Sequence, residues 1–202
     1  MKTLVLAAIR CSPMFTGVTA SLFSIRPAQA YTVTLHQVGS NVVATGSGAI
    51  NLTDLTFGSS TGETSVIIPS LGVVFTGPTN LSNTFLYIGE FSGPTSFGAG
   101  GQSFANSGSG DFVGFIALEV LLVPSEYVSG AALSDTSTYS GATFASLGVT
   151  PGTYVWTWGT GLPNQNFTLI IGGGSVPDGG STVSLLGCAL LGLAALRRKL
   201  SC

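Results

Sequence analysis

Apolar and polar residues alternate along most of the middle of the chain, which is the pattern of β-strands with one buried face. In Tyr31–Val38, the side chains of Tyr31, Val33 and Leu35 share one face of a strand, and polar residues share the other. A short turn follows, and Asn41–Ile50 is then predicted to return as the second strand of a hairpin.

Further strands are predicted between turns rich in Gly and Pro. The most hydrophobic stretch, Phe112–Val123, is apolar on both faces apart from Glu119, so we expect a central strand covered on both sides. Gly93–Gly110 is a long loop rich in Gly and Ser, and Ser125–Ala142 is a polar connection with one short strand. The other predicted strands are Leu55–Phe57, Ser65–Ile68, Val73–Thr76, Thr84–Ile88, Gly152–Trp158 and Asn166–Ile171.

The number and spacing of these strands define the expected fold class. No amphipathic helix of about ten residues is apparent between residues 31 and 171. Many short strands separated by turns favour an all-β domain, a single β-sandwich that is jelly-roll-like, over 31–171. A Gly-rich linker follows at 172–175, and residues 176–202 form a separate C-terminal segment.

The first thirty residues, 1–30, have the pattern of an export signal. A long basic region precedes the apolar run Met14–Ile25, whose length suits a signal peptide. Ala28-Gln29-Ala30 then provides a small-residue cleavage site, so cleavage is predicted between Ala30 and Tyr31. The alternative is a structured N-terminal helix.

The C-terminal segment, 176–202, has three parts in a fixed order. A turn-forming pentapeptide comes first, the uncharged run Val183–Leu196 follows, and a basic cluster lies near the chain end. A helix of fourteen residues is about 21 Å long, against a hydrocarbon core of about 30 Å, so it is a short transmembrane helix. The pentapeptide is Val176, Pro177, Asp178, Gly179 and Gly180, and the basic cluster is Arg197, Arg198 and Lys199.

This three-part order resembles the PEP-CTERM group of bacterial sorting tails, and most closely its VPDSG-CTERM variant. Position 179 is Gly where the motif of the variant has Ser. The resemblance implies export, transient retention in the inner membrane through the C-terminal helix, and processing at the motif by an exosortase-type membrane peptidase. It also implies a destination at the cell surface or in the extracellular matrix, with cell-envelope polysaccharide as a possible partner. An ordinary C-terminal membrane anchor is the alternative.

The charge distribution separates the body of the chain from its two ends. From Tyr31 to Ser175 there is no Lys or Arg, whereas seven acidic residues give this part a formal charge of about −7. A body without cations cannot neutralise phosphates, so nucleic-acid binding is excluded. After signal removal, the C-terminal basic cluster holds the only basic side chains apart from His36, and by the positive-inside rule it places the body outside the cell.

One aromatic row is the best candidate for a binding surface. Tyr154, Trp156 and Trp158 alternate along a predicted strand and therefore share one face. Exposed, this row would be a possible ligand face on which sugar rings could stack. Buried, it would be an aromatic layer between two sheets, which is the favoured interpretation because both tryptophans of the chain lie in it.

Candidate catalytic residues are few. His36 is the only histidine of the chain, no G-x-S-x-G elbow is present, and we expect His36 to lie on a solvent-exposed strand face. Glu119 is the only acid in an apolar context, and a sheet-rim glutamate is the simpler interpretation. We therefore expect a non-enzymatic exported surface protein without a metal or cofactor. A carbohydrate- or calcium-dependent binding module using the aromatic row is the alternative, although no calcium-loop motif occurs.

Overall fold

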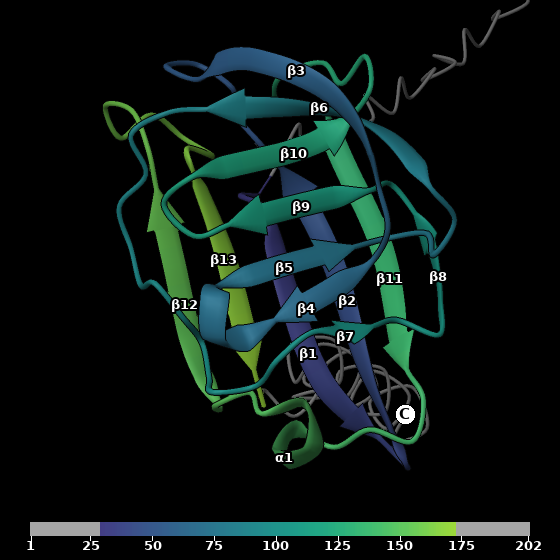
Figure 1. Ribbon diagram of the computed structural model, residues 1–202. Coiled ribbons are helices and arrows are strands. Elements are labelled where there is room, and N and C mark those ends of the chain that lie inside the picture. The colour runs from purple at the N-terminus through teal and green to yellow at the C-terminus, as the bar shows by residue number, and fades with distance from the viewer. Residues whose placement is uncertain (1–28, 173–202) are drawn as a thin grey trace, which may run out of the picture.

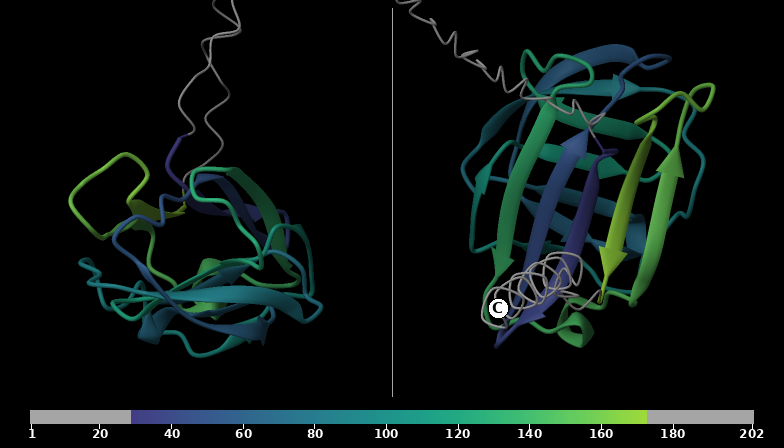
Figure 2. Two further views of the ribbon diagram at one scale, coloured as in Figure 1. Left: turned by 90° about the horizontal axis from the view of Figure 1, so that it is seen from above. Right: turned by 180° about the vertical axis from the view of Figure 1, so that it is seen from behind.

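The computed structural model describes residues 29–172, which form two β-sheets packed face to face (Figure 1, Figure 2). The only helical elements of this part are the short η1 (Pro69–Leu71) and α1 (Phe144–Leu147). The strands are β1 (Thr32–Val38), β2 (Asn41–Ala49), β3 (Thr56–Glu63), β4 (Val66–Ile68), β5 (Val73–Thr76), β6 (Ser82–Ile88), β7 (Ser103–Phe104), β8 (Ser107–Gly110), β9 (Val113–Ile116), β10 (Val120–Pro124), β11 (Ala132–Tyr139), β12 (Gly152–Thr157) and β13 (Asn166–Ile171).

Sheet A, the six-stranded sheet, has the order β12-β13-β1-β2-β11-β8. The predicted hairpin is its centre, because β1 pairs antiparallel with β2 from Thr32 opposite Ser47 to Val38 opposite Asn41. On the other side of β1 lies β13, the last strand of the domain, in a parallel pairing. The first and last strands therefore meet in the middle of sheet A.

Sheet B, the seven-stranded sheet, has the order β3-β6-β10-β9-β5-β4-β7, and all its pairings are antiparallel. Its strands run across those of sheet A (Figure 1), as in sandwiches whose two sheets cross. The prediction of a nearly all-β fold with two sheets is confirmed. The parallel β1–β13 pair departs from a jelly roll, which is built from antiparallel strands.

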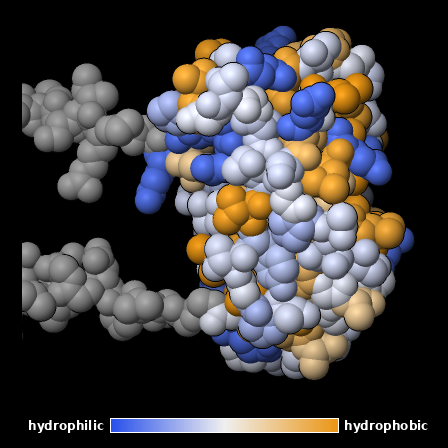
Figure 3. All heavy atoms as spheres, turned by 90° about the vertical axis from the view of Figure 1, so that its left-hand side faces the viewer, coloured by the Kyte–Doolittle hydropathy of each residue, from blue (hydrophilic) through white to orange (hydrophobic). Residues whose placement is uncertain are grey.

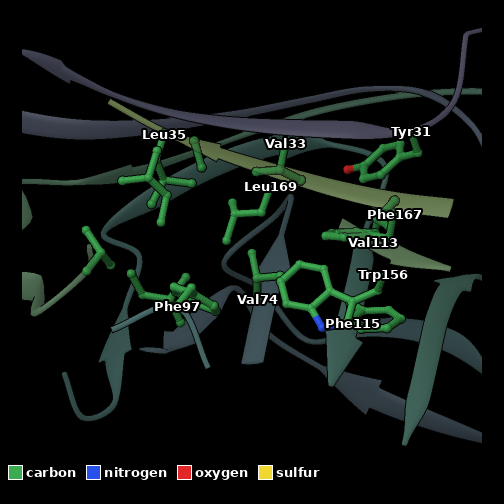
Figure 4. Packing of buried hydrophobic residues seen from close by; sticks show 14 of the residues in the cluster. Tyr31, Val33, Leu35, Val74, Phe97, Val113, Phe115, Trp156, Phe167 and Leu169 are labelled. Carbon is green, nitrogen blue, oxygen red and sulfur yellow. The ribbon is translucent and has the colours of Figure 1, made fainter. Parts of the chain in front are cut away.

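The core lies between the sheets and follows the predicted alternation. Val33 and Leu35 of β1 point inward with Leu169 of β13, and Val74 of sheet B packs from the other side (Figure 4). All four of these side chains are fully buried, whereas the polar residues between them on β1 are half-exposed. The period-two pattern of β1 therefore located the core face of sheet A correctly.

A second apolar cluster lies on the outer face of sheet B. Phe75 of β5 lies over Gly114 of β9, where an added Cβ would come within 2.7 Å of the Phe75 ring. Phe75 also meets Phe112 in an edge-to-face contact, with ring centroids 5.8 Å apart. The buried residues of this cluster are Val66, Val73, Phe75, Phe112 and Leu122. The two strands of the 112–123 region bury side chains on both faces, so the expected burial on two sides is confirmed for the strands, whereas Leu118 and Glu119 between them are exposed.

The prediction of one continuous strand over Phe112–Val123 is wrong. The segment folds into β9 and β10, which pair antiparallel with Val120 opposite Ile116, and residues 117–119 form the turn between them. Leu118 takes a left-handed backbone conformation in this turn, with φ of 63°. An apolar residue is an unusual occupant of that conformation, so the sequence carried no Gly, Asn or Pro to mark the turn.

Two other segments are more regular than predicted. The polar connection Ser125–Ala142 contains β11, an eight-residue strand that pairs with both β2 and β8. The long loop Gly93–Gly110 contains the short strands β7 and β8. Gly108 and Gly110 of β8 and Asp135 of β11 disfavour strands, so pairing with neighbouring strands rather than local preference accounts for these positions.

The predicted export signal and C-terminal transmembrane helix lie outside residues 29–172. Within this described range, the structure contains no helix with the length and apolar character needed to cross a membrane.

Candidate functional site

The predicted sorting site is the C-terminal segment, and it lies outside the residues that the structure describes. This applies to the motif Val176–Gly180, to the apolar run Val183–Leu196 and to the basic cluster Arg197–Lys199. The domain ends at β13 and Gly172, whose backbone N–H donates a 3.0 Å hydrogen bond to the carbonyl of Leu35. The segment that carries the motif therefore follows, after a short linker in sequence, a strand that is paired on both sides, with β12 and with β1.

The predicted signal cleavage site lies at the start of the described chain. The side chain of Tyr31 is fully buried, and its backbone N–H donates to the carbonyl of Ala49 at 3.1 Å. In turn, the N–H of Ala49 donates to the carbonyl of Gln29 at 2.8 Å. Ala30 forms a parallel bridge with Ala49, so the backbone on both sides of the Ala30–Tyr31 bond is tied to β2.

The aromatic row of β12 faces the core. Trp156 is fully buried and Trp158 is only 3 % exposed, whereas Tyr154 at the start of the row is half-buried. The ring of Trp156 lies 5.1 Å from that of Phe115 on sheet B, and Phe115 stacks on Phe167 of β13 at the same distance (Figure 4). These rings form an aromatic layer that joins the two sheets.

Hydrogen bonds to backbone carbonyls fix both indole rings. The Nε1–H of Trp156 donates to the carbonyl of Pro94 at 2.6 Å, and that of Trp158 donates to the carbonyl of Asn51 at 2.9 Å. Tyr154 likewise donates its hydroxyl to the carbonyl of Thr150 at 2.9 Å.

The three side chains therefore do not form an exposed ligand face. The favoured interpretation of the row as a core layer is confirmed by the burial of its two tryptophans. The β12 side of the molecule shows apolar and polar residues intermixed (Figure 3). Sugar rings stack on exposed aromatic ring faces, and the rings of Trp156 and Trp158 are buried.

A buried polar cluster that the sequence analysis missed joins the sheets near the start of the domain. The hydroxyl of Tyr31 donates a very short hydrogen bond to Asp135 Oδ2 of β11 and lies 3.2 Å from the hydroxyl of Thr76 on β5. Asp135 is only 2 % exposed, and among the described residues its second oxygen, Oδ1, has no hydrogen-bond partner. Gly46 of β2 lies directly beneath this contact.

Register explains how Gly46 makes room for the cluster. Gly46 pairs with Val33 on one side and with Asp135 on the other, so it lies between β1 and β11. A Cβ at this position would overlap the Tyr31 hydroxyl and approach both carboxylate oxygens of Asp135 to 2.6 Å. The absence of a side chain at Gly46 is what allows Tyr31 to reach across β2.

Burial dominates the electrostatics of this cluster. Loss of hydration raises the pKa of Asp135 to about 6, although the hydrogen bond from Tyr31 acts in the opposite direction. Burial likewise raises the pKa of the Tyr31 hydroxyl well above its ordinary value, and the neighbouring carboxylate of Asp135 adds to this shift. The pair is enclosed, so its chemistry is that of a structural contact within sheet A, and the contact of the Tyr31 hydroxyl with Thr76 links it to sheet B.

A neighbouring contact supports the same junction. Ser137, two residues beyond Asp135 on β11, is fully buried and contacts Gly77 just after β5. Its hydroxyl accepts from the N–H of Gly77 at 2.9 Å and donates to the carbonyl of Gly77 at 3.1 Å. β11 thus turns two polar residues inward, which explains why its sequence does not have the pattern of a core strand.

A neutral, open hollow of about 470 Å³ lies along β3 and β6. Ser60 pairs with Phe85 there, and Phe85 packs against the main core, so both side chains belong to the inner face of sheet B. Within the described chain, the side chains of Ser60, Asn83 and Ser125 make no hydrogen bond to protein. The lining residues are Ser60, Thr61, Gly62, Asn83, Thr84, Phe85 and Ser125.

The remaining candidate residues are not gathered into a site. Glu119 lies exposed in the β9–β10 turn, as expected for a sheet-rim glutamate. His36 is half-buried on β1. Between residues 29 and 172, no group of three or more His, Cys, Asp or Glu residues is placed to hold a metal ion.

The family model described as the VPDSG-CTERM motif matches residues 175–200. The match spans the pentapeptide, the apolar run and the basic cluster, and it is consistent with a sorting signal of the PEP-CTERM type. The resemblance found in this segment is therefore confirmed. Such a motif implies an exported, cell-surface-directed protein that an exosortase-type enzyme processes. No curated protein and no solved structure matches the chain.

Proposed function

We propose that this chain is a non-enzymatic exported protein that the C-terminal tail retains in the inner membrane and that is processed there before it reaches the cell surface or matrix. The match of residues 175–200 to a sorting motif is the observation that carries this proposal. The charge pattern supports it, because Arg197–Lys199 is the basic cluster that would stay on the cytoplasmic side of the apolar run.

The body domain fits a role outside the cell. Its core is closed and aromatic, and it contains no cysteine that would need a reducing compartment. The buried Tyr31–Asp135 pair contributes to a sheet junction, and Glu119 lies alone in a turn. We infer a stable, chemically inert domain whose position at the surface is set by the tail.

The test is the mass of the mature protein recovered from its host. We expect an N-terminus at Tyr31 and a C-terminus near Gly180, with residues 183–196 removed. Asp178→Ala in the motif should leave the tail attached, whereas Thr182→Ala, just beyond the pentapeptide, should be processed normally. Recovery of the wild-type chain ending at Cys202 would contradict processing and leave a plain membrane anchor.

We infer a second candidate function, contact with a neutral saccharide, from the hollow along β3 and β6. Phe57 is 52 % exposed and meets Phe85 edge to face with ring centroids 5.2 Å apart. The uncommitted polar groups of Ser60, Asn83 and Ser125 line the hollow together with Phe85. An apolar ring face next to neutral donors and acceptors suits a sugar, which has one apolar face and many hydroxyls.

Titration of the protein with a neutral glucan oligosaccharide, followed by backbone NMR shifts, tests this second candidate. Binding should shift the signals of Asn83 and Phe85 selectively, and Phe57→Ala should weaken it several-fold. Ser109→Ala, an exposed change on β8, serves as the control. Shifts absent from β3 and β6 at high oligosaccharide concentration would exclude this site.

A further inference from the structure

Strand β3 is the exposed edge of sheet B. It pairs only with β6, and its side chains are exposed from Thr56 to Ser60. Within residues 29–172, no backbone hydrogen bond joins β3 to any segment on its other side. Figure 1 shows β3 as the outermost strand at the top of the sheet. A row of backbone N–H and C=O groups is therefore available along an eight-residue strand.

The edge of sheet A at β12 is covered, in contrast. Ser92 and Thr157 exchange two backbone hydrogen bonds of 2.9 Å, and the indole of Trp156 holds the carbonyl of Pro94. Further along, the N–H of Thr150 donates to the carbonyl of Phe97 at 2.9 Å. The segment 92–98 thus runs along the outside of β12 and satisfies part of its edge.

The remaining two edges meet at one corner of the sandwich. β7, the far edge of sheet B, has only two residues, and the chain continues directly into β8, the edge of sheet A. Gly108 of β8 lies against the carbonyl of Gly77 of the other sheet, close enough that an added Cβ would overlap it. The sandwich is closed there, so β3 is the longest uncovered edge in the part of the chain that the structure describes.

The composition of β3 does little to protect this edge. Native edge strands commonly carry Lys or Pro, or are very short, to prevent pairing with another chain. β3 has the sequence TFGSSTGE, with neither Lys nor Pro, and its one bulge lies at Gly58 near its start. The five residues Ser59–Glu63 pair regularly with β6 and continue the ladder to the edge.

We propose that β3 is a self-association edge, on which a second copy of this chain adds its own β3 in antiparallel orientation about a two-fold axis. An axis at Thr61 places Thr61 opposite its own counterpart, which is a favourable cross-strand pair. The same register places Ser59 opposite Glu63 and Ser60 opposite Gly62. These pairs lie on matching faces of the two sheets, and no like charges face each other.

The charge of the body sets the strength of this contact. Two copies of about −7 each repel one another at long range, so the dimer forms weakly in dilute solution and more strongly as salt screens the repulsion. Retention of many copies in one membrane would raise their effective concentration and favour the contact. The contact itself does not depend on processing of the tail.

A charge swap at Ser59 tests the proposal by sedimentation of the mature protein. Ser59→Lys creates two exposed ion pairs with Glu63 of the other copy, and should raise the association constant about 2- to 30-fold. Ser59→Glu places like charges opposite each other and should lower the association constant by a similar factor. The matched controls are Ser107→Lys and Ser107→Glu, which make the same charge changes on β8.

Disulfide trapping tests the register. The body has no cysteine, so Thr61→Cys in a chain whose Cys11, Cys188 and Cys202 are replaced by Ser should form a covalent dimer on mild oxidation, and Ser107→Cys should not. A wild-type protein that stays monomeric at all salt and protein concentrations would overturn the proposal. Equal effects of the paired changes at Ser59 and Ser107 would overturn it as well.

Discussion

At the scale of single residues, the molecule depends on a polar contact inside an apolar core. Tyr31 and Asp135 come from strands on either side of β2, and they meet only because Gly46 between them has no side chain. The pair holds a carboxyl group away from water with one hydrogen bond to Oδ2 and none to Oδ1 among the described residues. Such a group is costly to bury, so its surroundings are sensitive to small changes.

Gly46→Ala should destabilise the domain strongly. The new methyl group would overlap the Tyr31 hydroxyl and crowd the Asp135 carboxylate, which forces the two strands apart. We expect a loss of about 3 kcal/mol or more in the free energy of unfolding, comparable to severe overpacking. Gly101→Ala is the control, since nothing lies within 4 Å of an added Cβ there. Equal denaturant midpoints for the two variants would contradict this account.

The stability of the domain should change with pH because Asp135 titrates at a different pH in the folded and unfolded states. Its pKa in the folded protein is about 6, against an ordinary value of 3.8, so the folded state keeps a proton that the unfolded chain loses. The stability from this group is fully present below about pH 4 and is lost as pH rises through about 6. The loss amounts to about 3 kcal/mol by pH 7.

Asp135→Asn removes this titration and keeps a side chain of similar shape. The unfolding free energies of the two proteins are measured by urea denaturation. The difference, variant minus wild type, should become about 3 kcal/mol more positive from pH 4 to pH 7. Comparison of the two proteins cancels the other carboxylates. Parallel stability curves over this pH range would show that Asp135 does not titrate as described.

At the scale of secondary structure, the aromatic row of β12 ties the two sheets together. Trp156 contacts Phe115 of β9 and Phe167 of β13, and the two indoles hydrogen-bond to the carbonyls of Pro94 and Asn51, which lie outside the strands. One strand therefore joins the core and two loops.

Tryptophan fluorescence should report this burial. Emission should be blue-shifted in the folded protein and resistant to quenching by iodide, and both properties should disappear on unfolding. Trp158→Phe and Trp156→Phe separate the two signals, and each should leave the remaining indole protected. Ready quenching of either indole in the folded protein would contradict the core position of that residue.

The strands that sequence could predict are those whose own residues alternate. β1, β5 and β13 were located closely because each has a clear apolar face or clear turn residues at its ends. β11 was predicted only as one short strand within a polar connection, because its inward positions include Asp135 and Ser137, whose polar partners come from elsewhere in the chain. The β9–β10 turn was missed because Leu118 adopts a conformation that its residue type disfavours.

The C-terminal segment, in contrast, could be recognised from the sequence alone. The order of pentapeptide, apolar run and basic cluster in 176–202 is local in sequence, so it was found without any structure. The Tyr31–Asp135 contact and the exposed edge of β3 depend on which strands become neighbours. Single-sequence patterns do not contain that information for strands far apart in the chain.

At the scale of the whole molecule, the body is a sandwich whose charges all have one sign, apart from His36. No Lys or Arg is present between Tyr31 and Ser175, so ion pairs with those residues cannot form within the domain. Its stability therefore comes from apolar burial and hydrogen bonds, and its carboxylates repel each other.

Salt should stabilise this domain. Sodium chloride screens repulsion between carboxylates and has no internal Lys or Arg pairs to weaken, so the melting temperature should rise by a few degrees between low and about 0.3 M salt. Dilute protein is needed so that self-association at β3 does not add to the effect. A melting temperature that falls as salt is added would contradict this picture.

The position of Tyr31 has a consequence for the order of events during export. Tyr31 is both the residue that follows the predicted cleavage bond and a buried residue of the core, and its neighbours Gln29 and Ala30 are paired to Ala49. A peptidase needs the scissile bond extended and free on both sides. If the chain is cut at the predicted Ala30–Tyr31 bond, cleavage has to come while the chain is still unfolded, because a domain that folds first would protect the bond. Cleavage would then compete with folding. A topology with many pairings between distant strands is expected to fold slowly, which would leave the peptidase more time to act.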